Sequence, residues 1–459
     1  MKNMTLTQIA RASGGKLYGE DPGREAAGVV MDSRKVEKDY LFIACVGERV
    51  DGHSYIDEVF DKGAIGVICE KAPETPKGPY ILVDNSFAAL KNIAIWYREQ
   101  LAIKVVGITG SVGKTSTKEF ISAVLEQKYQ VLKTEGNFNN EIGLPLTILR
   151  IRDTHQVAVL EMGISDFGEM HRLSEIAKPD ICVITNIGQC HLENLHSREG
   201  ILKAKSEIFD FMNEHGRVCV NGDDDMLITL QVVKGMRPVR FGLGKDNDVR
   251  ATDIVSKGLF GSSCNIHVGY KPLHAEIPQP GAHMIMNALA ATAVGSLLDM
   301  TNREIEAGIV CVKPVGGRSN ILREKNHTII DDCYNANPVS MKAALDLLSM
   351  ADTRKVAILG DMGELGRNED ALHREVGEYA IASRVDLLVC VGSLSLHMYQ
   401  GAQEQNKVST SQDNRQLLYF STRDEMIASL SSFLKEGDTI LVKASHFMGF
   451  EAVVKALQE

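Results

Sequence analysis

The fold of this chain follows from Gly107-Ile108-Thr109-Gly110-Ser111-Val112-Gly113-Lys114-Thr115-Ser116-Thr117, a glycine-rich stretch flanked by two apolar patterns. The apolar residues at 103–106 predict a buried strand, and those at 120–125 share one face of a predicted helix. A glycine turn between a strand and a helix presents backbone N–H groups, and the positive end of the helix dipole, to a polyphosphate. The sequence therefore predicts a phosphate-binding loop that binds a nucleoside triphosphate.

Side chains of this loop fit a nucleotide and its metal ion. We expect Lys114 to neutralise the outer phosphates and the Thr115 hydroxyl to hold Mg²⁺. Ile108 stands where the strict G-x-x-x-x-G-K-[ST] pattern has its first glycine, and Gly107 lies one residue upstream. A plain glycine-rich turn is the alternative, but Gly-Lys-Thr between a strand and a helix favours nucleotide binding. The predicted nucleotide contacts in the loop are Thr109, Gly110, Ser111, Gly113, Lys114, Thr115 and Ser116.

Length and composition predict an ordinary multidomain globular protein. The 459 residues suggest about three domains, and 44% hydrophobic with 24% charged residues is typical of substantial buried cores. No stretch is long and apolar enough to span a bilayer, and the first residues lack an apolar signal region. The nine cysteines show neither paired nor zinc-binding spacing. We therefore expect reduced thiols, a cytoplasmic location and no membrane insertion.

The net charge of −10 argues against a nucleic-acid partner. An acidic protein that binds nucleotides must hold them with discrete basic residues. Lys114, Arg34, Arg318 and Lys443 are the candidates, because each lies in a turn that contains Gly or Ser. We further expect a monomer.

The sequence divides into three blocks that predict an α/β protein of three domains. Residues 1–98 predict a small N-terminal α/β substrate domain, closed by a helix at 87–101. Residues 99–315 predict a central ATPase domain with a parallel sheet, to which 238–277 adds an antiparallel appendage. Residues 316–459 predict a C-terminal Rossmann-like α/β domain. In that third block Asn337-Pro338 predicts a helix start, with the Asn as its N-cap.

Polar side chains follow two predicted strands of the central block. The strand at 157–160 is followed by Glu161, and the strand at 181–185 by a segment that ends in His191. Ligands bind at the carboxyl ends of strands in open α/β sheets, so we expect both side chains beside the phosphate loop. Glu161 is a candidate Mg²⁺ ligand, with a solvated Glu as the alternative. For His191, and for Lys205 on a predicted helix, the residues alone favour a structural or exposed side chain.

The order of these motifs resembles the Mur ligase family, the ATP-dependent amide-forming ligases of peptidoglycan synthesis. Residues 107–117 match that family's variant of the phosphate loop, and 134–145 its Asn-rich segment. The resemblance implies a carbamylated Lys205, which gives a second Mg²⁺ an anionic oxygen ligand. It also implies that Asn287 contacts ATP. The implied metal ligands are Thr115, Glu161, His191 and Lys205.

Two further segments, 331–338 and 359–366, are similar to the family members that join D-alanyl-D-alanine to UDP-N-acetylmuramoyl-tripeptide. The tripeptide-forming members carry His-Thr-Pro-Asp and Asp-Asn-Pro-Arg elements that this chain lacks. Asp32-Ser33-Arg34 and Asp51-Gly52-His53 match the uridine-nucleotide end. Residues 443–446 resemble the family's Lys-Gly-Ser-Arg, with Ala and His in place of Gly and Arg.

This resemblance implies a mechanism in which ATP phosphorylates the tripeptide carboxylate and the amine of D-alanyl-D-alanine attacks the acyl phosphate. Arg318 follows a predicted hinge at 314–317 and is expected to reach the phosphates when the domains close. The implied catalytic residues are Lys114, Lys205, His191 and Arg318. The implied nucleotide contacts outside the loop are Asn287, Arg318, Asp332, Asn335 and Asn337. The implied substrate contacts are Ser33, Arg34, Asp51, Gly52, His53, Asn137, Asn139, Asn140, Lys443 and Ser445.

Three alternatives remain open at this point. A tripeptide-forming relative differs in its substrates, and a folylpolyglutamate synthase lacks the N-terminal uridine-binding block. A nucleotide-binding switch protein would use the same loop to regulate a partner.

Overall fold

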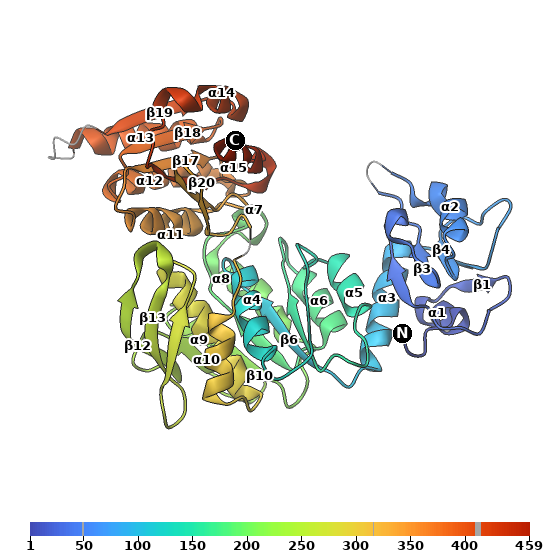
Figure 1. Ribbon diagram of the computed structural model, residues 1–459. Coiled ribbons are helices and arrows are strands. Elements are labelled where there is room, and N and C mark those ends of the chain that lie inside the picture. The colour runs from blue at the N-terminus through green and yellow to red at the C-terminus, as the bar shows by residue number, and fades with distance from the viewer. Residues whose placement is uncertain (48–49, 315, 409–414) are drawn as a thin grey trace.

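The computed structural model describes residues 1–47, 50–314, 316–408 and 415–459. The chain forms three α/β units, each built on its own sheet, and Figure 1 shows the N-terminal unit at one side and the C-terminal unit above the central one. The predicted three-domain α/β fold is confirmed. The boundaries predicted after residues 98 and 315 stay predictions, and residue 315 lies outside the described part.

The N-terminal sheet has the order β1-β5-β4-β3-β2, in which β2 to β5 are parallel and β1 is antiparallel to β5. Its strands are β1 (Lys16–Tyr18), β2 (Gly28–Val30), β3 (Tyr40–Ile43), β4 (Gly66–Cys69) and β5 (Tyr80–Leu82). Its helices are α1 (Leu6–Ser13), η1 (Ser33–Lys35), η2 (Gly52–Tyr55), α2 (Ile56–Asp61) and α3 (Ser86–Glu99).

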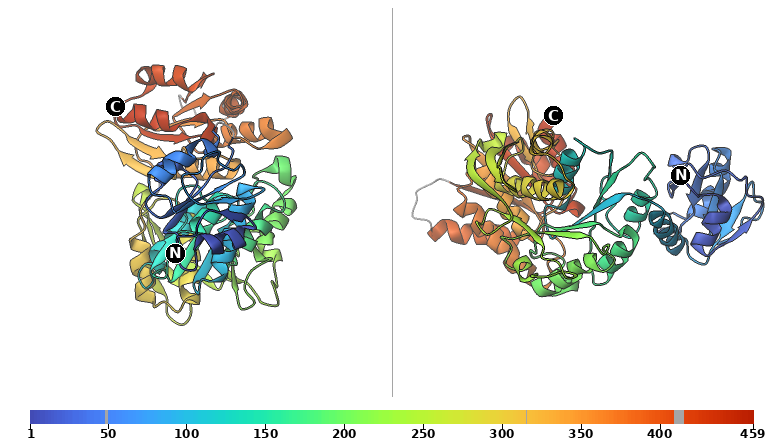
Figure 2. Two further views of the ribbon diagram at one scale, coloured as in Figure 1. Left: turned by 90° about the vertical axis from the view of Figure 1, so that its right-hand side faces the viewer. Right: turned by 90° about the horizontal axis from the view of Figure 1, so that it is seen from below.

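Helix α3, predicted to close the small domain, also joins it to the central unit. Asn85 caps its first turn, accepting a hydrogen bond from the Ala88 N–H at 2.8 Å. At the other end the Tyr97 hydroxyl donates to the Ile151 carbonyl at 2.7 Å, and the Arg98 guanidinium donates to the Ala177 carbonyl at 2.8 Å. Figure 2 shows α3 between the two units in the view from below.

The central sheet has nine strands in the order β14-β13-β12-β11-β10-β9-β6-β8-β7. Its strands are β6 (Lys104–Thr109), β7 (Val131–Lys133), β8 (Val157–Glu161), β9 (Ile181–Ile184), β10 (Arg217–Asn221), β11 (Val239–Gly242), β12 (Val249–Ser256), β13 (Ser262–His267) and β14 (Leu273–Ile277). Its helices are α4 (Lys114–Leu125), α5 (Gly143–Ile148), α6 (Glu169–Ala177), α7 (Leu192–Leu195), α8 (Arg198–Ser206), η3 (Glu207–Phe209), η4 (Leu227–Thr229), η5 (Gly258–Phe260), α9 (Ala282–Leu297) and α10 (Asn302–Val310).

Antiparallel pairing begins one strand later than predicted. Strands β12, β13 and β14 pair antiparallel as expected, but β11 pairs parallel with both β10 and β12. Phe241 of β11 and Val249 of β12 are buried in the same apolar core as α4 and α9. The appendage therefore extends the central sheet, because its strands share the core of the parallel part.

The C-terminal sheet has the order β15-β16-β20-β17-β18-β19, and only β15 is antiparallel to its neighbour. Its strands are β15 (Asn320–Arg323), β16 (Thr328–Asp331), β17 (Lys355–Gly360), β18 (Leu387–Val391), β19 (Gln416–Phe420) and β20 (Thr439–Lys443). Its helices are α11 (Pro338–Ser349), η6 (Gly366–Asn368), α12 (Glu369–Ala382), α13 (Ser395–Val408), α14 (Arg423–Phe433), η7 (His446–Met448) and α15 (Glu451–Gln458). The predicted Asn337 cap is confirmed, since its side chain accepts a hydrogen bond from the Ser340 N–H at 2.9 Å.

All nine cysteines lie in the described part of the chain and carry free thiols. Within that part no helix combines the length and the apolar character needed to cross a membrane.

Candidate active site

Two glycines give the phosphate-binding loop its path between β6 and α4. A Cβ atom on Gly110 would lie 1.9 Å from the Thr185 hydroxyl oxygen, so no other residue fits there. Gly113 has φ +81° and begins α4 in a left-handed conformation that favours glycine. Ile108 lies inside β6 and is fully buried. The glycine missing from the strict pattern is thus replaced by a core residue of the strand.

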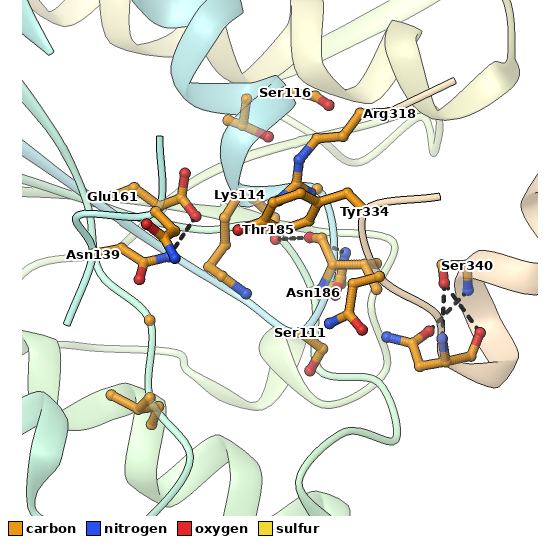
Figure 3. Close-up of a pocket in the computed structure, with 18 of the residues that line it drawn as sticks. Ser111, Lys114, Ser116, Asn139, Glu161, Thr185, Asn186, Arg318, Tyr334 and Ser340 are labelled. Atoms are coloured by element: carbon orange, nitrogen blue, oxygen red, sulfur yellow. Dashed lines mark hydrogen bonds between the residues drawn. The ribbon is translucent and has the colours of Figure 1, made fainter. Parts of the chain in front are cut away.

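The segment after β9 anchors this loop. The Ser111 N–H donates to the Asn186 carbonyl at 3.0 Å, and the Val112 N–H donates to the Asn186 side-chain oxygen at 3.0 Å. The Thr185 hydroxyl donates to the Val112 carbonyl at 2.6 Å. Figure 3 shows Thr185 and Asn186 directly beside Ser111. Asn186 begins the polar segment that was expected beside the loop, but neither residue was named as a site residue; their position at the end of a strand beside β6 was the available signal.

Lys114, which was predicted to neutralise the outer phosphates, lies over the phosphate-binding loop. Its ammonium group donates to the Gly110 carbonyl at 2.8 Å. Burial lowers the pKa of Lys114, and the nearby Glu161 carboxylate opposes that shift. The Lys114 amine therefore lies against the backbone of the loop, where a polyphosphate would replace the carbonyl as its partner.

Glu161 is buried and fixed by three groups of the central unit. One carboxylate oxygen accepts a hydrogen bond from the Thr115 hydroxyl at 2.8 Å. The other accepts one from the Asn139 side-chain amide at 2.9 Å, as Figure 3 shows. Its N–H donates to the Thr134 hydroxyl at 3.0 Å. A carboxylate and a hydroxyl at this distance, next to a phosphate-binding loop, are the oxygen donors that suit Mg²⁺.

His191 lies at the start of α7 and meets the C-terminal unit. Its backbone has φ +50°, and its Nδ1 atom lies 2.6 Å from Oε2 of Glu364. Nδ1 is buried, but no described residue forms a hydrogen bond of good geometry with it. The pKa of Glu364 is lowered by its interaction with this ring. Glu364 lies inside a segment quoted for its resemblance, yet no role was predicted for it.

Lys205 is fully buried, and its amine has no hydrogen-bond partner among the described residues. Burial lowers its pKa to about 8; the nearby Cys190 thiol opposes the shift and the Lys114 charge adds to it. A buried lysine with a lowered pKa is neutral far more often than an exposed one.

The C-terminal unit supplies two further pairs. The Arg318 guanidinium lies over the Tyr334 ring, 4.2 Å from its centre, as Figure 3 shows. The Lys443 ammonium lies 2.5 Å from a carboxylate oxygen of Asp332 and donates to the Asn335 carbonyl at 2.9 Å. Tyr334 was not predicted as a site residue.

A cavity of about 1060 Å³ brings residues of the central and C-terminal units together. The predicted site residues that line it are Ser111, Gly113, Lys114, Ser116, Asn137, Asn139, Asn140, Glu161, His191, Asn287, Arg318, Asp332, Asn335, Asn337 and Lys443. Asn287 accepts a hydrogen bond from the Thr117 hydroxyl at 2.8 Å, which ties α9 to α4. The predicted residues that do not line it, although they belong to the same two units, are Thr109, Gly110, Thr115, Lys205 and Ser445.

The predicted uridine-binding residues lie in the N-terminal unit and outside this cavity. Asp32 caps η1 by accepting from the Arg34 N–H at 3.0 Å, and Asp51 caps η2 by accepting from the His53 N–H at 3.0 Å. The Arg34 side chain extends into solvent and pairs with Asp32 at 2.8 Å. Ser33 and Gly52 open the two short helices. These are two similar turns of the same small sheet.

The described residues contain no cluster of three or more His, Cys, Asp or Glu side chains arranged to hold a metal ion. Protein sites for Mg²⁺ commonly supply one or two carboxylates and leave the remaining positions to phosphates and water. Glu161 with Thr115 fits that kind of site.

Comparison with known proteins gives matches along most of the chain. Residues 25–114 match the family described as Mur ligase family, catalytic domain; residues 108–295 match the Mur ligase middle domain, and residues 317–446 the Mur ligase, glutamate ligase domain. A protein of Bacillus subtilis (strain 168) named UDP-N-acetylmuramoyl-tripeptide--D-alanyl-D-alanine ligase is 37% identical, covering 94% of this chain and 93% of that protein.

Two solved structures are also similar. The MurF crystal structure I from Acinetobacter baumannii has a TM-score of 0.89 at 31% identity and covers 99% of this chain and 98% of that one. The MurF ligase from Thermotoga maritima in complex with ADP has a TM-score of 0.80 at 28% identity and covers 94% of this chain and 97% of that one. The sequence matches and the similarity of the whole fold agree, and the chain belongs to the Mur ligase family.

Proposed function

We propose that this chain joins D-alanyl-D-alanine to the terminal carboxylate of UDP-N-acetylmuramoyl-tripeptide at the expense of ATP, in peptidoglycan precursor synthesis. The observation that carries the proposal is the cavity in which the phosphate loop faces Arg318, Asp332 and Asn337 of the C-terminal unit. The named relative, similar over nearly its full length, supports the same pair of substrates.

The reaction requires activation, because a free carboxylate does not form an amide with an amine in water. The carboxylate oxygen of the tripeptide attacks the γ-phosphorus of ATP, and ADP leaves. The amine of D-alanyl-D-alanine then attacks the acyl phosphate carbon, loses a proton, and phosphate leaves. Lys114 and Arg318 reduce the repulsion between the carboxylate and the triphosphate, both of which are anions. Docking of the C-terminal unit excludes water that would hydrolyse the acyl phosphate.

Thr115, Glu161, His191 and a modified Lys205 would hold the metal. Mg²⁺, in two positions, supplies further positive charge to the transferred phosphoryl group when it is bound. The neutral Lys205 amine can add to the carbon of CO₂ and release one proton, which leaves a carbamate. Its complete burial, unpartnered amine and lowered pKa support this modification.

The N-terminal unit would hold the uridine nucleotide through the capped turns at 32–34 and 51–53. Asn137, Asn139 and Asn140 line the cavity beside the phosphate loop, and the peptide would extend towards them. Asn287, Asp332, Asn335 and Asn337 would contact ATP, and Lys443 and Ser445 the incoming dipeptide. We place the domains at 1–98, 99–315 and 316–459, and the active form as a monomer in the cytoplasm.

Phosphate release tests this function. With UDP-N-acetylmuramoyl-tripeptide, ATP and Mg²⁺, we expect sustained release only when D-alanyl-D-alanine is added. Release with a dipeptide substrate and a free diamino acid would point to a tripeptide-forming ligase. Release with folate and glutamate would point to a folylpolyglutamate synthase. No release with any of these pairs would favour a nucleotide-dependent switch.

A further inference from the structure

The contact between His191 and Glu364 joins two units at the edge of the nucleotide cavity. His191 belongs to the segment that follows β9, and the same segment anchors the phosphate loop through hydrogen bonds between Gly188 and the Ser111 hydroxyl. Glu364 belongs to the turn between β17 and η6 of the C-terminal unit. The distance of 2.6 Å between His191 Nδ1 and Glu364 Oε2 makes this an ion pair across the domain junction whenever the ring is protonated.

The backbone holds both residues in the left-handed region. His191 has φ +50° and Glu364 has φ +59°. Residues other than glycine adopt this conformation at a free-energy cost, and they keep it where the surrounding structure demands it, often at functional sites. An exposed ion pair by itself contributes little to stability, and the Glu364 side chain is 64% exposed. Stability therefore does not explain why two strained residues meet here.

The turn that carries Glu364 is anchored to its own unit, the C-terminal one. Its neighbours Met362 and Leu365 are buried, and the Gly363 N–H donates to the Ser445 hydroxyl at 2.9 Å. Gly366, with φ +67°, packs against the backbone of Glu193 in α7, since a Cβ there would lie 3.5 Å from it. The position of Glu364 is therefore fixed by the C-terminal sheet and by its contact with the helix that His191 begins.

A histidine that binds a metal through one ring nitrogen commonly donates its other N–H to a carboxylate, which fixes the tautomer and the ring orientation. With Nδ1 beside Glu364, Nε2 is the nitrogen left to reach the cavity that His191 lines.

We infer that Glu364 is a positioning residue: it orients His191 for the nucleotide-bound metal, and it does so only when the C-terminal unit is docked. This inference rests on the proposed function, because it needs a metal beside the phosphate loop. It follows that docking of the C-terminal unit completes the metal site, whereas the phosphate loop is formed within the central unit before docking.

The test measures how Mg²⁺ supports binding of β,γ-imido-ATP, a non-hydrolysable ATP analogue, to the full-length protein by calorimetry. Glu364→Ala should raise the Mg²⁺ concentration for half-maximal binding about tenfold, while analogue binding without Mg²⁺ and the melting temperature stay unchanged. Glu364→Gln keeps an acceptor for the ring N–H and should show a smaller shift. In a His191→Ala background, Glu364→Ala should add nothing.

A matched control is available in the central unit. His171 Nδ1 lies 2.6 Å from a carboxylate oxygen of Asp210, away from the cavity, so Asp210→Asn removes a similar pair and should leave the Mg²⁺ dependence unchanged. A shift below twofold in Glu364→Ala, or an equal shift with and without His191, would overturn the inference. If the wild-type protein shows no Mg²⁺-dependent binding of the analogue at all, the proposed function itself fails.

Discussion

Two predicted metal ligands lie on either side of the strand that leads into the phosphate loop, and they are held in different ways. Glu161 ends β8, and its partners Thr115, Asn139 and Thr134 all belong to the central unit. His191 follows β9, and its nearby carboxylate, Glu364, comes from the C-terminal unit. Strand β6 lies between β8 and β9 in the sheet.

This difference divides the predicted metal site into two parts. The part around Glu161 is preorganised within the central unit, and the part around His191 is assembled from two units. Glu161, the predicted oxygen ligand, is in place within the central unit, so on the proposed function Mg·ATP can bind there before the C-terminal unit docks. His191, the predicted nitrogen ligand, acquires its orientation on our inference from the C-terminal unit. Binding and chemistry can then be ordered, because the second part of the site forms only when the third domain arrives.

The largest expected effect comes from Lys114, which faces the loop between the two ligands. Lys114→Ala should lower kcat/KM for ligation about a thousandfold or more, because no other cation lies in the loop itself. The Gly110 carbonyl loses one partner, and the circular-dichroism spectrum should not change. Phosphate release within tenfold of wild type from a folded variant would refute the role of the loop.

Lys205, a further predicted metal ligand, can be tested through its effect on protein stability. In CO₂-free buffer its pKa is about 8 in the folded chain and near 10.5 when unfolded, so the folded state binds fewer protons between these values. Stability therefore rises with pH across that window, and below pH 8 burial of the charge costs about 3 kcal/mol. Lys205→Met should raise the urea midpoint most below pH 8, with an advantage that shrinks towards pH 10.5. A pH-independent difference would contradict the lowered pKa.

Glu161→Gln tests the preorganised side. We expect it to weaken Mg²⁺-dependent binding of β,γ-imido-ATP at least tenfold, and by the same factor in the wild-type and Glu364→Gln backgrounds. The loss caused by His191→Ala should instead shrink in the Glu364→Gln background. Calorimetry on the two double-mutant cycles measures both couplings. A Glu161–Glu364 coupling above about 0.5 kcal/mol would mean that the two sides are not independent.

The smallest expected effects concern the two nucleotide-binding regions, one for the UDP-substrate in the N-terminal unit and one for ATP in the C-terminal unit. Arg34→Ala should raise the Michaelis constant for the UDP-substrate about tenfold, the loss of one charge-assisted contact, and leave that for ATP unchanged. Asn337→Asp should do the reverse, since it keeps the oxygen that caps α11 and removes the amide donor. Asn337→Ala would also lose the cap, worth about 1 kcal/mol. Steady-state kinetics measure the Michaelis constants of each variant for both substrates. Equal effects on both would refute the assignment of the uridine nucleotide to the N-terminal unit and of ATP to the C-terminal unit.

Features encoded locally could be predicted from the sequence. The strand, loop and helix around Lys114 depend on glycines and apolar spacing within a few residues, and the Asn337 cap depends on one side chain and the next turn. Strands β15 and β19 carry no comparable local signal, because they lie at the two edges of their sheet, where most residues are only half-buried and no continuous apolar run is needed.

Contacts between separate elements of the fold could not be predicted, because no local sequence pattern specifies them. Glu364 lies in the segment 359–366, which resembles other members of the family. Its approach to His191, however, depends on how the C-terminal sheet docks. The stacking of Arg318 on Tyr334 similarly joins a turn to the end of a strand. The parallel pairing of β11 depends on the core beneath α9, which only the folded chain defines.

Because helix α3 packs against two of the three sheets, we expect fewer than three cooperatively unfolding units in this chain. One apolar core runs from Leu41 in the N-terminal sheet through Ile93 of α3 to Leu160 in the central sheet, and the Arg98 guanidinium is buried at the far end of the helix. The cores of the C-terminal sheet are separate clusters. On heating, the first two units should melt together in one calorimetric transition, and the third should be able to unfold and refold while the uridine nucleotide stays bound.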